Sequence, residues 1–229
     1  MNTPETTIAE RIALVRERIA EAAIRAGRAP GSVRLLAVSK MKPAEVVRAA
    51  YEAGQREMGE NYVQELGAKA AALADLGELR WHMIGPLQRN KVKQVVGVAA
   101  LVHTVDRVSL AEEIEKRAAA IGRVVPVLLE VNVAGEASKA GCSPEEAPAL
   151  AAAVREMAHV ELRGLMTIPP DTEDREEARP FFRRLRELRD RLGGDLPELS
   201  MGMSHDFEIA IEEGATIVRV GTAIFGARS

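Results

Sequence analysis

A lysine stands at the end of an apolar, strand-like run near the N-terminus. The run VRLLAVS (33–39) leads directly into Lys40, and Pro43 is placed to start a helix just beyond it. A charge is costly where a chain leaves a buried sheet, and burial favours the uncharged amine that attacks aldehydes. Lys40 is therefore a candidate Schiff-base lysine. The alternative is a lysine whose ammonium group reaches solvent along its apolar stem.

Small and hydroxyl-bearing residues follow two strand-like runs near the C-terminus. Ser200 to Ser204 reads SMGMS, and Gly221-Thr222 ends the run ATIVRVGT. Glycine lets backbone N–H groups approach an anion, hydroxyls donate to its oxygens, and a helix expected near Ser204 would add its dipole. These segments are a candidate phosphate site, although such short stretches also occur as plain tight turns.

Arg219 interrupts the apolar run TIVRVG and shares a strand face with Ile217 and Gly221. A buried guanidinium must find an acceptor: a structural role would pair it with Glu60 or Asp106, whereas a functional role would offer it to a ligand. A lysine for an aldehyde, a cup for a phosphate and an arginine for a ring together suit pyridoxal 5′-phosphate (PLP).

Strand-like and helix-like segments alternate after an N-terminal amphipathic helix over 6–26. The helix after the fifth strand is expected to have Ser143 as its N-cap and Pro144 as its first residue. The expected strands cover 33–39, 56–60, 79–85, 101–106, 125–133, 160–168, 198–203 and 215–221.

Eight such strands, most of them followed by a helix, predict an α/β fold, a single (β/α)8 TIM barrel. An open doubly wound sheet is the alternative, because periodicity does not show closure. We expect one domain over 1–229, with residues 1–27 as an extra N-terminal helix packed on it. The carboxyl ends of the strands then place Lys40, Arg219 and the candidate phosphate site on one face. His82, His103 and Asp106 come from different strands without ligand spacing, so no metal site is expected.

Composition excludes several other classes of protein. The 229 residues are 47% hydrophobic and 28% charged with a net charge of -3, so the chain can bury a core and has no overall attraction to nucleic acid. The single cysteine, Cys142, excludes an internal disulfide and fits a reducing compartment. There is no secretory signal and no apolar run of roughly 20 residues, so we expect a cytoplasmic protein without a membrane partner. We also expect a monomer, because no long apolar surface helix argues for a dimer.

Ordered sequence blocks along nearly the whole chain, from about residue 6 to Gly226, resemble the pyridoxal phosphate homeostasis proteins (YggS/PROSC family). The family has the barrel of alanine racemase without its second domain. The small departures, Met83 and Pro86, do not touch the proposed contacts. The blocks are AVSK (37–40), GENYVQE (59–65), WHMIGPLQRNK (81–91), HTVD (103–106), LSMGMSHD (199–206) and VRVGTAIFG (218–226).

The resemblance implies that Lys40 holds PLP as an internal aldimine. It places Arg219 at the pyridine nitrogen and Asn61 beside the ring. The remaining contacts that it implies are the Met201-Gly202 backbone in the cup and, around the phosphate, Ser204, Gly221 and Thr222.

The expected function is to bind PLP in intracellular homeostasis, buffering or delivering it, with PLP-requiring apo-enzymes as candidate partners. An arginine that donates to the ring nitrogen favours the unprotonated pyridine ring. This form is a poorer electron sink, which disfavours transamination and decarboxylation. Racemisation is the first alternative, but the resembled racemases take one acid/base group from a tyrosine in a second domain, and this chain has only Tyr51 and Tyr62. A PLP-sensing scaffold is the second alternative. We therefore expect no enzyme. Lys42 and Lys139 are expected to be solvated loop lysines, with Lys139 a possible second amine.

Overall fold

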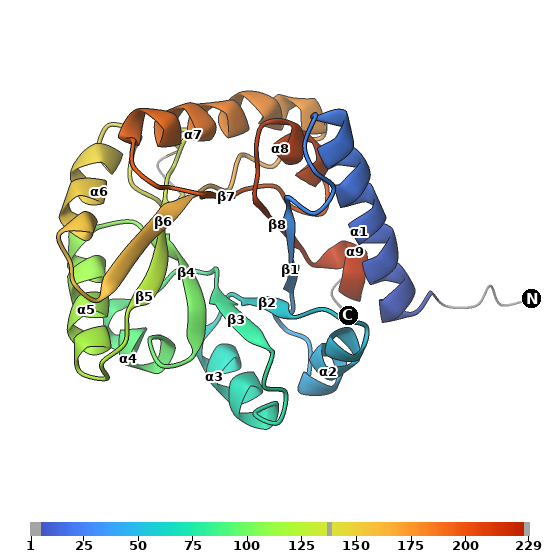
Figure 1. Ribbon diagram of the computed structural model, residues 1–229, viewed down its shortest axis with the longest axis horizontal. Helices are drawn as coiled ribbons and strands as arrows, with labels where there is room; N and C mark the ends of the chain where they lie inside the picture. Colours follow the sequence, from blue (N-terminus) through green and yellow to red (C-terminus); the bar gives the residue numbers. More distant parts are fainter. Residues whose placement is uncertain (1–5, 137–138, 227–229) are drawn as a thin grey trace, which may run out of the picture.

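Eight parallel strands close into a barrel, and the helices surround it (Figure 1). The computed structural model describes residues 6–136 and 139–226. β1 pairs with β2 on one side and with β8 on the other, where Leu36 lies opposite Arg219, and this second pairing closes the sheet. The predicted barrel is confirmed, and the open sheet is excluded. The strands are β1 (Arg34–Val38), β2 (Glu57–Glu60), β3 (Arg80–Met83), β4 (Ala99–Val105), β5 (Val125–Glu130), β6 (Val160–Met166), β7 (Glu198–Ser200) and β8 (Ile217–Val220).

The N-terminal helix α1 (Ile8–Arg25) precedes the first strand and lies against α2, α8 and α9 (Figure 1). It begins with a capping box, in which Thr7 Oγ1 accepts from Glu10 N and the Glu10 carboxylate accepts from Thr7 N. The other helices are α2 (Ala44–Glu52), α3 (Val63–Ala72), α4 (Val92–Val95), α5 (Val108–Ala119), α6 (Ala147–Arg155), α7 (Arg179–Leu192), α8 (Phe207–Glu212) and α9 (Thr222–Phe225), with 3-10 turns η1 (Arg89–Lys91) and η2 (Arg175–Ala178).

Two helices begin later than the sequence predicts. Ser143 is not the N-cap of α6, which starts at Ala147. Ser143 instead exchanges hydrogen bonds with Glu146 across a turn, at 2.8 and 3.2 Å, and this turn replaces the first predicted helical residues. The helix expected near Ser204 starts at Phe207. Both differences lie in loops at the carboxyl ends of strands, and the Ser143–Glu146 bonds have the reciprocal pattern of a capping box, one turn before the regular helix.

The barrel interior is filled by alternate residues of its strands. An apolar cluster occupies part of it, and buried polar side chains lie there too, among them those from β3, β4, β5, β7 and β8. In the described part of the chain, no helix has the length and apolar character needed to span a membrane. The apolar interior cluster comprises Leu36, Ile84, Leu101, Leu128, Met166 and Ile217.

Candidate functional site

A cavity of about 280 Å³ opens at the carboxyl ends of the strands. Six of the eight predicted cofactor-binding residues line it, although they come from segments more than 180 residues apart: Lys40, Asn61, Ser204, Arg219, Gly221 and Thr222. Barrels of this kind carry their active or binding sites at this end. The closed fold thus brings together Lys40, Arg219, and the hydroxyl-bearing residues Ser204 and Thr222.

Met201 and Gly202 are not among the residues that line the cavity. Met201 is fully buried, and its N–H donates to Ile217 O at 3.1 Å. Gly202 has a φ of +89°, and a Cβ atom there would lie 2.6 Å from Ala210 Cβ, so glycine is needed for the close approach of α8. The predicted contribution of the Met201 and Gly202 backbone to the candidate phosphate site stays a prediction.

Arg219 is held by neutral acceptors. It is 4% exposed; Nη1 donates to Ser200 Oγ and Nη2 to Thr167 O, both at 2.9 Å. The predicted structural pairs are wrong, because Glu60 pairs with Lys69 and Asp106 pairs with Arg107. Burial lowers the pKa of Arg219 to about 10, against the opposing carboxylates of Asp206 and Glu130, so the guanidinium is a cation at neutral pH.

A hydrogen-bonded pair of histidines supports the other side of Ser200. His103 Nδ1 lies 2.9 Å from Ser200 Oγ, and His103 Nε2 lies 3.0 Å from His82 Nδ1. Burial lowers the pKa of both rings, that of His82 to about 3, so both are neutral, with one donor and one acceptor nitrogen each.

The donors and acceptors in this series of hydrogen bonds, from Arg219 through Ser200 and His103 to His82, can be assigned from Arg219, which can only donate. The Ser200 hydroxyl accepts from Arg219, so it can donate to His103, which donates to His82. The His82 Nε2–H then faces Glu57 Oε2 at 4.0 Å, an oxygen without a hydrogen-bond partner among the described residues. The histidines thus belong to the support of Arg219. Across 6–136 and 139–226, no group of three or more His, Cys, Asp or Glu side chains is arranged to hold a metal ion.

We expect Ser200→Ala to destabilise the fold by about 2 kcal/mol, because it leaves the Arg219 guanidinium and His103 each short of a partner in a buried site. Urea unfolding of the parent and the variant measures the difference. Ser204→Ala is the comparison, since Ser204 is half-buried and accepts one long bond, 3.3 Å, from Gly221 N; its effect should be smaller. Equal losses of unfolding free energy in the two variants would contradict the assigned hydrogen bonds of Ser200.

Several groups that line the cavity are suited to a ligand. Ser204 Oγ and the exposed Thr222 supply hydroxyls, and a Cβ atom on Gly221 would lie only 3.2 Å from Val38 O, so this position favours glycine. Asn61 also lines the cavity, and its Oδ1 is buried without a hydrogen-bond partner in the described part of the protein. Together, an amine, a guanidinium, hydroxyl groups and an acceptor oxygen without a partner among the described residues fit the chemical groups of PLP.

Sequence reasoning missed several lining residues. Lys42 was expected to be solvated, but it is half-buried and lines the cavity. Strand alternation could have indicated two others, because Val38 follows Leu36 and Ile84 follows His82 on the inward face. Lys139 is half-buried rather than solvated: its Nζ donates to Pro169 O at 2.9 Å and pairs with Glu136 at 3.2 Å. The remaining lining residues are Ile168, Met203, His205, Phe225 and Gly226.

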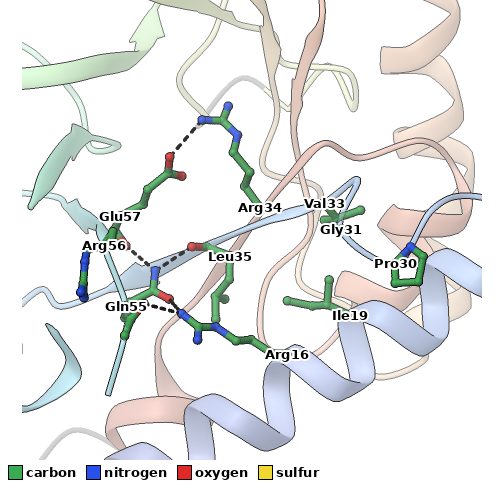
Figure 2. A pocket seen from close by; sticks show the side chains of 11 residues that line it. Arg16, Ile19, Pro30, Gly31, Val33, Arg34, Leu35, Gln55, Arg56 and Glu57 are labelled. Atoms are coloured by element: carbon green, nitrogen blue, oxygen red, sulfur yellow. Dashed lines mark hydrogen bonds and ion pairs between the residues drawn. The ribbon is translucent and has the colours of Figure 1, made fainter. Parts of the chain in front are cut away.

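A second cavity, of about 360 Å³, lies at the other end of the barrel, beside α1 and the starts of β1 and β2. Figure 2 shows its polar groups engaged with one another: Arg16 with Gln55, Gln55 with the Leu35 carbonyl, and Arg34 with Glu57. Charged groups at the N-terminal ends of barrel strands usually serve stability. The cavity at the carboxyl ends is therefore the candidate site.

The fold and this cavity define a barrel of the alanine racemase N-terminal type. The sequence profile of that family, alanine racemase, N-terminal domain, matches residues 13–229. The alanine racemase of Corynebacterium glutamicum superposes with a TM-score of 0.65 at 18% identity, covering 94% of this chain and 61% of that one. This likeness concerns the fold alone.

The sequence relatives are more specific. A pyridoxal phosphate homeostasis protein of Pseudomonas aeruginosa is 54% identical over 97% of this chain and 96% of its own length, and one of Aquifex aeolicus is 53% identical over 96% and 97%. PipY of Synechococcus elongatus, in a structure with PLP bound, superposes with a TM-score of 0.84 at 39% identity, covering 96% of this chain and all of PipY. The chain belongs to the pyridoxal phosphate homeostasis protein family.

Proposed function

We propose that this protein binds PLP in the cavity at the carboxyl ends of its strands and serves PLP homeostasis. The observation that carries the proposal is that Lys40, Arg219 and the Ser204 and Gly221-Thr222 segments line one cavity. Family membership and the PLP-bound structure of the relative PipY support it. When bound, PLP supplies an aldehyde that condenses with an amine, with loss of one water, and a ring that can accept electron density.

Five of the lining residues have chemistry that suits a role in binding PLP. Lys40 supplies the amine, and Arg219, fixed by two hydrogen bonds, presents a cationic donor to the ring nitrogen. The hydroxyl groups of Ser204 and Thr222 donate hydrogen bonds to the phosphate. Asn61 offers its unpaired Oδ1 beside the ring.

The site supports holding the cofactor better than catalysis with it. Neither tyrosine of the chain lines the cavity: Tyr62 is 53% exposed, and Tyr51 packs on Arg56. The acid/base pair that racemisation needs on two faces of a substrate therefore lacks its tyrosine. We propose a non-enzymatic, single-domain, monomeric cytoplasmic protein that can pass PLP to apo-enzymes.

We expect Lys40→Ala to abolish the visible absorption band of protein mixed with PLP and purified by gel filtration, because the amine that condenses with the aldehyde is gone. Absorbance spectra of the parent and the variant measure this. Lys116→Ala, on the exposed side of α5, is the matched control and should keep the band. A parent protein without the band would refute PLP attachment, and a band lost in Lys42→Ala instead would reassign the lysine.

A further inference from the structure

The turn that carries Lys40 has an uncommon backbone. Lys42 N donates to Ser39 O at 3.0 Å, so Lys40 and Met41 occupy the two central positions of a β-turn. Met41 has a φ of 60°, the one positive φ at a non-glycine residue in the described segments. A positive φ at the third position is what a type II turn requires, and glycine or asparagine is favoured there. Methionine holds this conformation against a steric preference for other backbone angles.

Packing of the Met41 side chain does not explain why the turn persists. The residue is 61% exposed. Its backbone is tied instead: Met41 N donates to Glu65 Oε2 at 2.7 Å, which links the turn to the first part of α3. A strained conformation persists only where the surroundings over-determine it.

Lys69 of α3 joins this contact to the residue on the other side of Lys40. It is 6% exposed, and its Nζ donates to Ser39 O at 2.7 Å, to Glu60 Oε1 at 2.7 Å and to Glu65 Oε2 at 2.8 Å. Ser39 Oγ donates to the same Glu60 oxygen at 2.6 Å. All three donors of the ammonium group are used, and the contacts converge on the residues that flank Lys40.

The two carboxylates that pair with Lys69 differ in burial, and their pKa values shift in opposite directions. Glu60 is fully buried, and burial raises its pKa despite the hydrogen bonds from Lys69 and Ser39. Glu65 is partly exposed, and the hydrogen bonds from Lys69 and Met41 lower its pKa against the opposing effect of burial. Breaking one partner of such a buried pair leaves an uncompensated charge, so the geometry is strongly determined.

We propose that Lys69 is a positioning residue: with Glu60 and Glu65 it clamps both sides of the turn so that Lys40 faces the cavity. The clamp keeps a strained turn in place before any ligand arrives, which reduces the ordering that binding must accomplish. This inference rests on the proposed function, because it takes Lys40 as the attachment lysine.

The test uses Glu65→Ala, which removes the acceptor of Met41 N at a side chain that is 28% exposed, so that the fold is spared. We expect the PLP dissociation constant, from titration of the visible band, to rise about tenfold, because the strained turn relaxes. Met41→Gly in the same background should bring it back to within about threefold of the parent, since glycine adopts this φ freely. Glu78→Ala, which removes the exposed ion pair with Arg56 far from the turn, should leave it unchanged.

A second readout does not require PLP. Hydrogen exchange of the Met41 amide should be slow in the parent and accelerate in Glu65→Ala, and Lys69→Met should behave likewise if it folds. Three results would each overturn the clamp: an unchanged PLP dissociation constant in Glu65→Ala, a loss of PLP affinity that Met41→Gly does not restore, or unchanged exchange of the Met41 amide. A parent protein that does not bind PLP would overturn the proposed function instead, and the exchange measurement would still decide whether the clamp exists.

Discussion

Gly164→Ala is expected to destabilise the barrel by about 4 kcal/mol or to prevent folding. Gly164 lies in β6 opposite Glu198 of β7, and a Cβ atom on it would lie 1.9 Å from Glu198 O and 2.7 Å from Glu198 C. Both atoms belong to backbone, so no side-chain rotation relieves the clash. The two strands would have to separate, with loss of the ladder between them.

The consequences of this change would reach the cavity. β7 carries Ser200, which holds Arg219, and it leads directly into the segment that ends at Ser204. The pairing of β5 with β6 also shifts register between Val127 and Leu128, just where Gly164 sits, as glycine at a bulge does. We therefore expect any folded fraction of the variant to bind PLP poorly.

The matched control for this variant is Gly67→Ala. Gly67 lies inside α3, and a Cβ atom there meets no atom within 4 Å. Alanine should stabilise the helix by about 1 kcal/mol or less. Chemical unfolding of both variants measures the two effects. A Gly164→Ala protein as stable as the parent would show that β6 and β7 do not approach as closely as described.

The barrel and the location of the site could be predicted from sequence because both depend on a repeating physical pattern. Strands that end in polar residues and alternate with helices specify parallel pairing, and closure then carries all the carboxyl ends to one face. Lys40 and Arg219 could be assigned to the same face for this reason, although they lie 179 positions apart in the sequence. The pairing of β1 with β8 delivers that result.

The partners of buried polar groups could not be predicted in the same way. Charge alone suggested Glu60 or Asp106 for Arg219, but its acceptors are Ser200 and a backbone carbonyl, which only the register of β6, β7 and β8 brings within reach. Similarly, Glu65 and Lys69 have the spacing of an ordinary exposed helix pair. Tertiary packing turns Lys69 inward, where it reaches the loop after β1.

Glu130 at the end of β5 gives the second large expected effect, and its sign depends on pH. The side chain is 6% exposed, and burial, reinforced by Asp106 and opposed by Arg219, raises its pKa from 4.5 to about 7. Below pH 4.5 the carboxyl group is protonated in both the folded and unfolded protein and costs nothing. As the pH rises from 4.5 to 7, only the unfolded chain ionises, so stability is lost; above 7 the loss is constant at about 3 kcal/mol.

Glu130→Gln should therefore stabilise the protein by up to about 3 kcal/mol at pH 8 and have little effect at pH 4, because glutamine has the size of glutamic acid and stays neutral. Urea unfolding of the parent and the variant at both pH values measures the difference, and comparing the two proteins at each pH cancels the other titrating groups. Glu112→Gln, on the exposed side of α5, is the control and should show no such gain. A loss of stability at pH 8 would mean that the pKa of Glu130 in the folded protein lies below its ordinary value, because the Arg219 cation stabilises the carboxylate more than burial destabilises it. Glu130 would then be a stabilising ion-pair partner of the guanidinium that we assign to the ring nitrogen, not a group whose ionisation destabilises the fold.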